Sequence, residues 1–112
     1  MKIITKALDF SELKEMTALF GNMVKAVVDV DKGLLALDAE LHSDLEALLL
    51  ENGSKQEDLW GINLYPELPD NQFVEFDSMI NMRPSQGNRS RGVESEEVRS
   101  KIIEIIKNIV NK

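Results

Sequence analysis

The chain has 112 residues, a formal net charge of −7 and no cysteine. This length fits one domain spanning residues 1–112, with a hydrophobic core but no room for a separate regulatory domain. Without cysteine there is no disulfide, thiolate zinc site, iron–sulfur cluster or cysteine nucleophile. The sequence lacks a membrane-length apolar run and a secretory signal, so we expect a cytoplasmic protein without membrane contact.

The first half of the chain predicts a strand, a helix and a β-hairpin. Asp9 or Ser11 is the expected cap of the first helix, which Gly21 ends. The hairpin turn holds Gly33 where a positive φ is wanted. The two hairpin strands follow from β-branched and alternating residues. The strands of this half are expected at residues 3–4, 24–30 and 34–39.

Ser43 and Glu46 form a Ser-x-x-Glu pattern typical of a helix N-terminus. It predicts a helix that ends at Asn52-Gly53. The alternative for residues 44–51 is a strand that enters a hairpin at Asn52-Gly53.

Two further strands are predicted over residues 59–65 and 73–82. Pairing Tyr65 with Phe73 gives one apolar and one polar face, as an antiparallel pair covered on one side requires. A long loop and a last helix, about residues 95–110, complete the order β-α-β-β-α-β-β-α. We therefore expect an α+β fold, with a mainly antiparallel sheet and helices packed on one face.

Three of the four arginines of the chain fall between positions 83 and 91, and residues 78–93 contain no acidic side chain. Guanidinium groups bind phosphate and carboxylate, and the following helix N-terminus favours anions. This segment therefore predicts a loop that binds an anion. The candidate ligand-binding residues, including polar neighbours on the preceding strands, are Arg83, Ser85, Gln86, Asn88, Arg89, Arg91, Asn63 and Asn81. The alternative is that the arginines form ion pairs with nearby carboxylates and so fix the conformation of the loop.

His42 is the only histidine, and it lies near several carboxylates. A histidine with a carboxylate partner acts as a general base or a metal ligand. The catalytic candidates are His42, Asp44 and Asp77, and the candidate metal ligands are His42 and Glu46. Because one histidine falls short of a recognised metal motif, no metal or cofactor is predicted. The alternative for this segment is helix capping and polar packing.

The proposed register brings Gly61 opposite Asp77 and Asn63 opposite Glu75. A glycine facing Asp77 leaves space for a ligand or for the arginine loop. In the second case the loop buries an Asn–Asp–Arg network for structural reasons. Separately, the wide apolar face of the last helix packs on its own sheet or forms a homodimer seam.

The segments 60–66, 40–42 and 76–93, with the motifs WGINLYP and FDSMINMRPSQGNRSRGV, resemble a small prokaryotic domain family of unknown function. The resemblance spans the chain from about Lys6 to the last helix. It implies a free-standing bacterial or archaeal protein and no particular activity.

Three hypotheses about function follow. The first is a binding module whose loop binds a small anion or an acidic protein surface. Nucleic acid is a less favoured ligand in this hypothesis. It predicts that alanine at Arg89 or Arg91 abolishes binding with little effect on stability. The second is a hydrolase-like enzyme with His42 as base, which requires His42 near the arginine loop. The third is an interaction protein that uses the last helix.

Overall fold

The computed structural model describes residues 1–111. Its strands and helices follow the predicted order, with three short additions: β2, α3 and β7. The elements are β1 (Lys2–Ile4), β2 (Leu8–Asp9), α1 (Phe10–Met16), β3 (Val24–Asp29), β4 (Leu34–Leu37), α2 (His42–Glu51), β5 (Leu59–Leu64), α3 (Asp70–Phe73), β6 (Val74–Glu75), α4 (Glu96–Ile109) and β7 (Val110–Asn111). Single turns of 3₁₀ helix occur at Thr17–Leu19, Gln56–Asp58, Met79–Asn81 and Pro84–Gln86.

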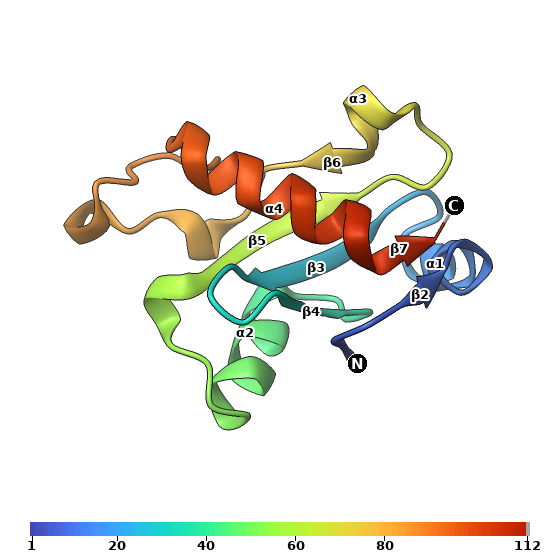
Figure 1. Cartoon of the computed structure of the whole chain (residues 1–112), viewed down its shortest axis with the longest axis horizontal. Coiled ribbons are helices and arrows are strands. Elements are labelled where there is room, and N and C mark those ends of the chain that lie inside the picture. Colours follow the sequence, from blue (N-terminus) through green and yellow to red (C-terminus); the bar gives the residue numbers. More distant parts are fainter. Residues whose placement is uncertain (112) are drawn as a thin grey trace.

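Five strands form an antiparallel sheet in the order β1-β4-β3-β5-β6 (Figure 1). The predicted hairpin is present as β3 and β4. In its turn, the Asp29 carboxylate accepts hydrogen bonds from the backbone N–H groups of Asp31 and Lys32, and Gly33 has a φ of 69°. The α+β class and the mainly antiparallel sheet are thus confirmed.

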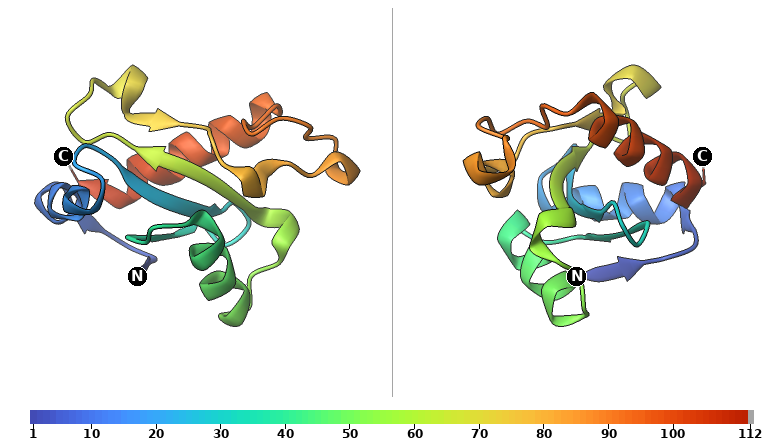
Figure 2. Two further views of the ribbon diagram at one scale, coloured as in Figure 1. Left: turned by 180° about the vertical axis from the view of Figure 1, so that it is seen from behind. Right: turned by 60° about the vertical axis from the view of Figure 1, so that its left-hand side comes forward.

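Helices cover both faces of this sheet, so the expectation of helices on one face was wrong (Figure 2). Alternate residues of a strand point to opposite faces, and here both faces carry a buried apolar cluster. Helices α1 and α4 bury one face, with Ile102 and Ile106 of α4 in its core. Helix α2 buries the other face through Leu45 and Leu49. Much of the apolar stripe of α4 is therefore used inside the chain.

Helix α2 is present where the sequence favoured a helix over a strand, but the predicted capping box is wrong. The helix begins at His42, two residues earlier than a cap at Ser43 requires, and Leu41 occupies the cap position without a side-chain hydrogen bond. Its first turn consequently has no side-chain cap. By contrast, Ser95 caps α4 through its hydroxyl, which accepts a hydrogen bond from the N–H of Val98.

The predicted pairing of β5 and β6 has the right register but is much shorter than expected. Asn63 pairs with Glu75 and Leu64 with Val74. The strand predicted over 73–82 was otherwise wrong, because the chain leaves the sheet after Glu75 and makes a 3₁₀ turn at Met79–Asn81. The absence of a side chain at Gly61 allows this departure. A Cβ at Gly61 would lie 2.5 Å from Cβ of Ser78, so Ser78 packs directly against the glycine instead of pairing with β5 as part of a strand. This departure shapes the candidate site.

Candidate functional site

Side chains take the place of a strand along the outer edge of β5, beyond the point where β6 ends. The carboxamide of Asn81 pairs with Gly61 in both directions. Its Oδ1 accepts from the Gly61 N–H at 2.8 Å, and its Nδ2 donates to the Gly61 carbonyl at 3.0 Å. Further along the edge, Arg83 donates to the carbonyls of Leu59, at 2.7 Å, and of Gln56. The backbone groups that β6 leaves open are therefore satisfied by these two side chains.

Asn88 organises the arginine loop from inside. Its Nδ2 donates to the carbonyls of Asn81 at 2.7 Å and Gly92 at 2.8 Å, and its Oδ1 accepts from the N–H of Glu94. The Glu94 carboxylate in turn accepts from the N–H groups of Arg89 and Ser90. These two backbone bonds lower the pKa of the exposed Glu94 carboxyl. The loop is thus held by polar bonds within the chain.

Arg83 is built into the fold. Its guanidinium carbon lies 4.2 Å from the ring centroid of Trp60, and its terminal nitrogens bind backbone carbonyls. Burial lowers the pKa of Arg83, with the nearby Glu46 and Asp58 opposing that shift. Both terminal nitrogens of this guanidinium are thus engaged by backbone carbonyls, and its plane is stacked on the indole ring.

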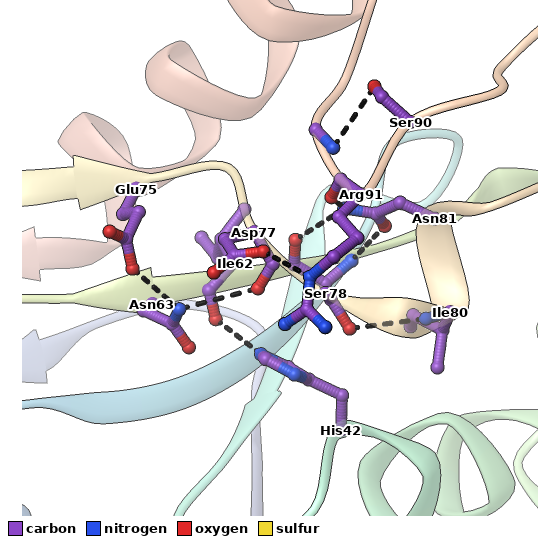
Figure 3. A network of polar contacts seen from close by, with 12 residues as sticks. His42, Ile62, Asn63, Glu75, Asp77, Ser78, Ile80, Asn81, Ser90 and Arg91 are labelled. Atoms are coloured by element: carbon purple, nitrogen blue, oxygen red, sulfur yellow. Dashed lines mark hydrogen bonds and ion pairs between the residues drawn. The ribbon is translucent and has the colours of Figure 1, made fainter.

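Arg91 has a different environment. The backbone of Arg91 is fixed, because its carbonyl accepts from the N–H of Ser78 and from Nδ2 of Asn81, both at 2.9 Å. The side chain is about half exposed and donates through Nε to Oδ1 of Asp77 at 2.6 Å. In Figure 3 its two terminal nitrogens point toward His42. Within residues 1–111 these two nitrogens make no hydrogen bond.

His42 enters the same place from the first turn of α2. It is 8% exposed, and its Nε2 lies 2.8 Å from the carbonyl oxygen of Ile62 (Figure 3). A carbonyl only accepts, so Nε2 carries the proton and Nδ1 holds a lone pair. Burial lowers the pKa of His42; Lys25 and Arg91 lower it further, whereas the Ile62 bond and Asp77 oppose the shift. His42 is therefore a neutral imidazole near neutral pH.

Asn63 lies on β5 next to the residue that binds His42. Its Nδ2 donates to Oε1 of Glu75 at 2.8 Å and to the Asp77 carbonyl at 3.3 Å. The residue is 5% exposed, and its Oδ1 is buried without a donor in the described chain. A buried acceptor left unpaired costs about 1–3 kcal/mol. We call His42, Asn63, Asp77 and Arg91 the Arg91–His42 site.

The site thus unites four of the candidate residues that the sequence singled out. Others from the same predictions lie elsewhere or make structural bonds. Gln86 donates to the Glu57 carbonyl, and Ser85 and Arg89 are exposed. Asp44 is exposed, and Glu46 lies near Arg83 rather than bonding to His42. Among residues 1–111 no group of three or more His, Asp or Glu side chains could hold a metal ion.

Sequence reasoning missed Lys25, and it did not include Glu75 or Tyr65 among the candidate site residues although the register placed Glu75 opposite Asn63. Lys25 pairs in register with Asn63 from β3, and its charge lowers the pKa of His42. Glu75 accepts from Asn63 and from the hydroxyl of Tyr65 at 2.9 Å. Burial and this Glu75 bond raise the pKa of Tyr65. A usable signal was present, because Lys25 interrupts the apolar run from Val24 to Val28.

Comparison with known proteins gives a family and no activity. The family model described as "Protein of unknown function (DUF5674)" matches residues 2–109. The chain belongs to this family. The match confirms the resemblance to an uncharacterised domain family, while the prokaryotic origin stays a prediction. No curated protein and no solved structure matches the chain. Within the described residues, no helix is long and apolar enough to cross a membrane.

Proposed function

We propose that the protein binds a small anionic group, a phosphate or a carboxylate, at the Arg91–His42 site. One observation carries this proposal. Arg91 uses only Nε to bind Asp77, so its two terminal nitrogens are oriented toward His42 and free to bind. Two parallel N–H groups of a guanidinium match two oxygens of a phosphate or carboxylate.

The surroundings favour negative charge. Lys25 adds a second cation near His42, and α2 begins at His42 with no side chain capping its first turn. Uncapped N–H groups and the helix dipole attract anions to a helix N-terminus. Asp77 opposes this field, but its bond to Nε fixes the direction of the guanidinium. An oriented guanidinium loses less conformational entropy when a ligand binds.

The test uses His42 as a built-in probe, since it is the only histidine of the chain. Sodium phosphate, pyrophosphate and acetate are titrated separately while NMR follows the imidazole signals. We expect a saturable shift with at least one of these anions. Arg91→Met should weaken binding at least about tenfold, the effect of one charged hydrogen bond.

Arg89→Met is the matched control. Arg89 is exposed and lies two residues from Arg91 in the same loop. Its substitution by methionine changes the net charge by the same amount as Arg91→Met. It should retain most of the binding. Equal losses in both variants would mean that the loop attracts anions only by its overall charge, and would refute the site.

A second function, base-catalysed hydrolysis, is favoured by the position of His42. The hydrolase hypothesis required His42 within reach of the loop, and the structure places it beside Arg91 and Asp77 (Figure 3). Nδ1 would take a proton from water as the water attacks a bound phosphate ester, then return it to the leaving oxygen. Arg91 would stabilise the developing charge. Turnover of a chromogenic phosphate ester that His42→Phe abolishes would support this function.

Absence of any imidazole shift would favour the remaining partners from the sequence hypotheses, an acidic protein surface or a second copy of the chain. Sedimentation of the protein alone would test the second copy. The cytoplasmic location is part of this proposal, and cell fractionation would test it.

A further inference from the structure

We infer that the Arg91–His42 site selects an anion that carries a hydroxyl proton, such as hydrogen phosphate, over a fully ionised anion of the same shape, such as sulfate. This inference rests on the proposed function, because it concerns which anion the same site accepts. It depends on acceptors as well as donors at the site.

The acceptor on His42 is fixed by its neighbour. Nε2 faces the carbonyl oxygen of Ile62, which has no proton to give. Nε2 must therefore carry the proton, and Nδ1 must present a lone pair. The other tautomer would place two lone pairs against each other across 2.8 Å. Nδ1 makes no hydrogen bond within residues 1–111, so it is available to accept one.

The acceptor on Asn63 is fixed in the same way. Nδ2 faces the Glu75 carboxylate and the Asp77 carbonyl, both of which only accept. Rotating the amide by half a turn would replace these bonds with repulsion, so Oδ1 must point away from Glu75. Figure 3 shows this oxygen on the side of His42. It is a buried acceptor with no donor in the described chain.

The site therefore combines free N–H donors on Arg91 with two acceptors, Nδ1 of His42 and Oδ1 of Asn63. Their neighbours prevent either group from turning into a donor. A tetrahedral anion with one O–H group complements both kinds of atom, since its oxygens accept from Arg91 and its proton goes to a lone pair. We assign that proton to His42 Nδ1. Sulfate offers only acceptors, which would oppose the lone pairs of His42 and Asn63.

The decisive experiment compares sodium phosphate with sodium sulfate on the full chain at about pH 8 and equal ionic strength. Above the second pKa of phosphate both anions are dianionic and tetrahedral, so the proton is the main difference between them. Affinities come from the His42 NMR shift, with calorimetry as a second measurement. We expect phosphate to bind at least about tenfold more tightly, the worth of one good hydrogen bond against a repulsive contact.

Two variants test whether His42 is responsible for the preference for phosphate over sulfate. His42→Phe keeps a ring but removes the lone pair, so phosphate affinity by calorimetry should fall to that of sulfate. His42→Gln can donate to Ile62 and still offer an oxygen, so it should recover part of the preference. If His42→Phe does not fold, the ratio of phosphate to sulfate affinity in the wild type and in His42→Gln still tests the selectivity.

The outcomes separate the two proposals. If phosphate does not bind, the selectivity is overturned, and the proposed function fails as well if pyrophosphate and acetate do not bind either. If both anions bind with equal affinity, the anion site stands and the selectivity is overturned. A preference for phosphate that persists in His42→Phe would also overturn the assignment of the proton to His42.

Discussion

Arg83 and Arg91 lie eight positions apart in one loop, yet the structure uses them differently. Arg83 is stacked on Trp60, and its terminal nitrogens bind backbone carbonyls of the segment that leads into β5 and of β5 itself. Within residues 1–111, the side-chain hydrogen bond of Arg91 is the one from Nε to Asp77, and the side chain is about half exposed. The same residue type therefore completes the fold at one position and is available to a ligand at the other.

This difference shows that an arginine-rich loop is not by itself a binding loop. What distinguishes the two positions is the supply of acceptors from the fold. The carbonyls of Gln56 and Leu59 engage both terminal nitrogens of Arg83, whereas the carbonyl of Arg91 already accepts from Ser78 and Asn81. The following substitutions test this division, from the largest expected effect to the smallest.

Asn81→Leu should have the largest effect on stability. Asn81 is fully buried, and its carboxamide serves the Gly61 N–H, the Gly61 carbonyl and the Arg91 carbonyl. Leucine is similar in size but leaves these groups unpaired, so we expect a loss of roughly 3–5 kcal/mol. Urea unfolding followed by circular dichroism measures it. A loss below about 1 kcal/mol would show that the edge of β5 does not need Asn81.

Gly61→Ala should destabilise by about 1–3 kcal/mol, because the added methyl group would lie 2.5 Å from Cβ of Ser78. The cause can be checked directly. In the double variant with Ser78→Gly, part of the loss should return, giving a coupling between the two sites. Purely additive losses in urea unfolding would mean that the close contact is not the cause.

Arg83→Met and Arg91→Met test the division between the two arginines with the same change in charge. Arg83→Met should cost about 2 kcal/mol and shift the emission of Trp60, the only tryptophan, since the stacked guanidinium is lost. Arg91→Met should change stability by no more than about 0.5 kcal/mol, as for an exposed ion pair. Equal effects on the unfolding free energy would contradict the division.

The smallest effect concerns pH. Burial lowers the pKa of His42 in the folded chain, while the unfolded chain keeps the ordinary value of about 6.5. Below about pH 6.5 the unfolded state therefore binds more protons, so the stability linked to His42 is complete above this pH and is lost as pH falls. Unfolding curves at about pH 7 and pH 5 for the wild type and His42→Phe measure it. Parallel pH dependence in both proteins would contradict the shift.

The sequence predicted the elements whose residues follow simple periodic patterns. The hairpin, the register of Asn63 with Glu75 and the helices α2 and α4 all follow from apolar spacing and turn residues. The helix α2 was predicted correctly, but its cap was not. Ser43 in a Ser-x-x-Glu pattern is a cap only if the chain turns there, and the helix instead starts at His42.

The strand expected over 73–82 shows what periodicity does not reveal. In the predicted strand Ser78 lies on the apolar face and Asn81 on the polar face that would be open to solvent, yet both are buried. One packs against Gly61 and the other binds its backbone. A polar side chain facing water and one bonded to another strand leave the same pattern in a sequence.

The site was predicted in part. His42, Asn63, Asp77 and Arg91 were all singled out, and a network of asparagine, aspartate and arginine was one of the alternatives. Their meeting depends on contacts between segments far apart in the chain, such as His42 with Ile62. The orphan oxygen of Asn63 and the fixed tautomer of His42 follow only from the geometry of their partners.

The short length of β6 has a consequence for assembly. A strand edge with free N–H and carbonyl groups is a template onto which another chain can add a strand, and repeated addition leads to fibrils. Here the edge of β5 beyond β6 is closed by the amide of Asn81 and the guanidinium of Arg83, neither of which can extend into a new strand. The loop that carries Arg91 to its site therefore also protects this part of the sheet edge against the addition of another strand.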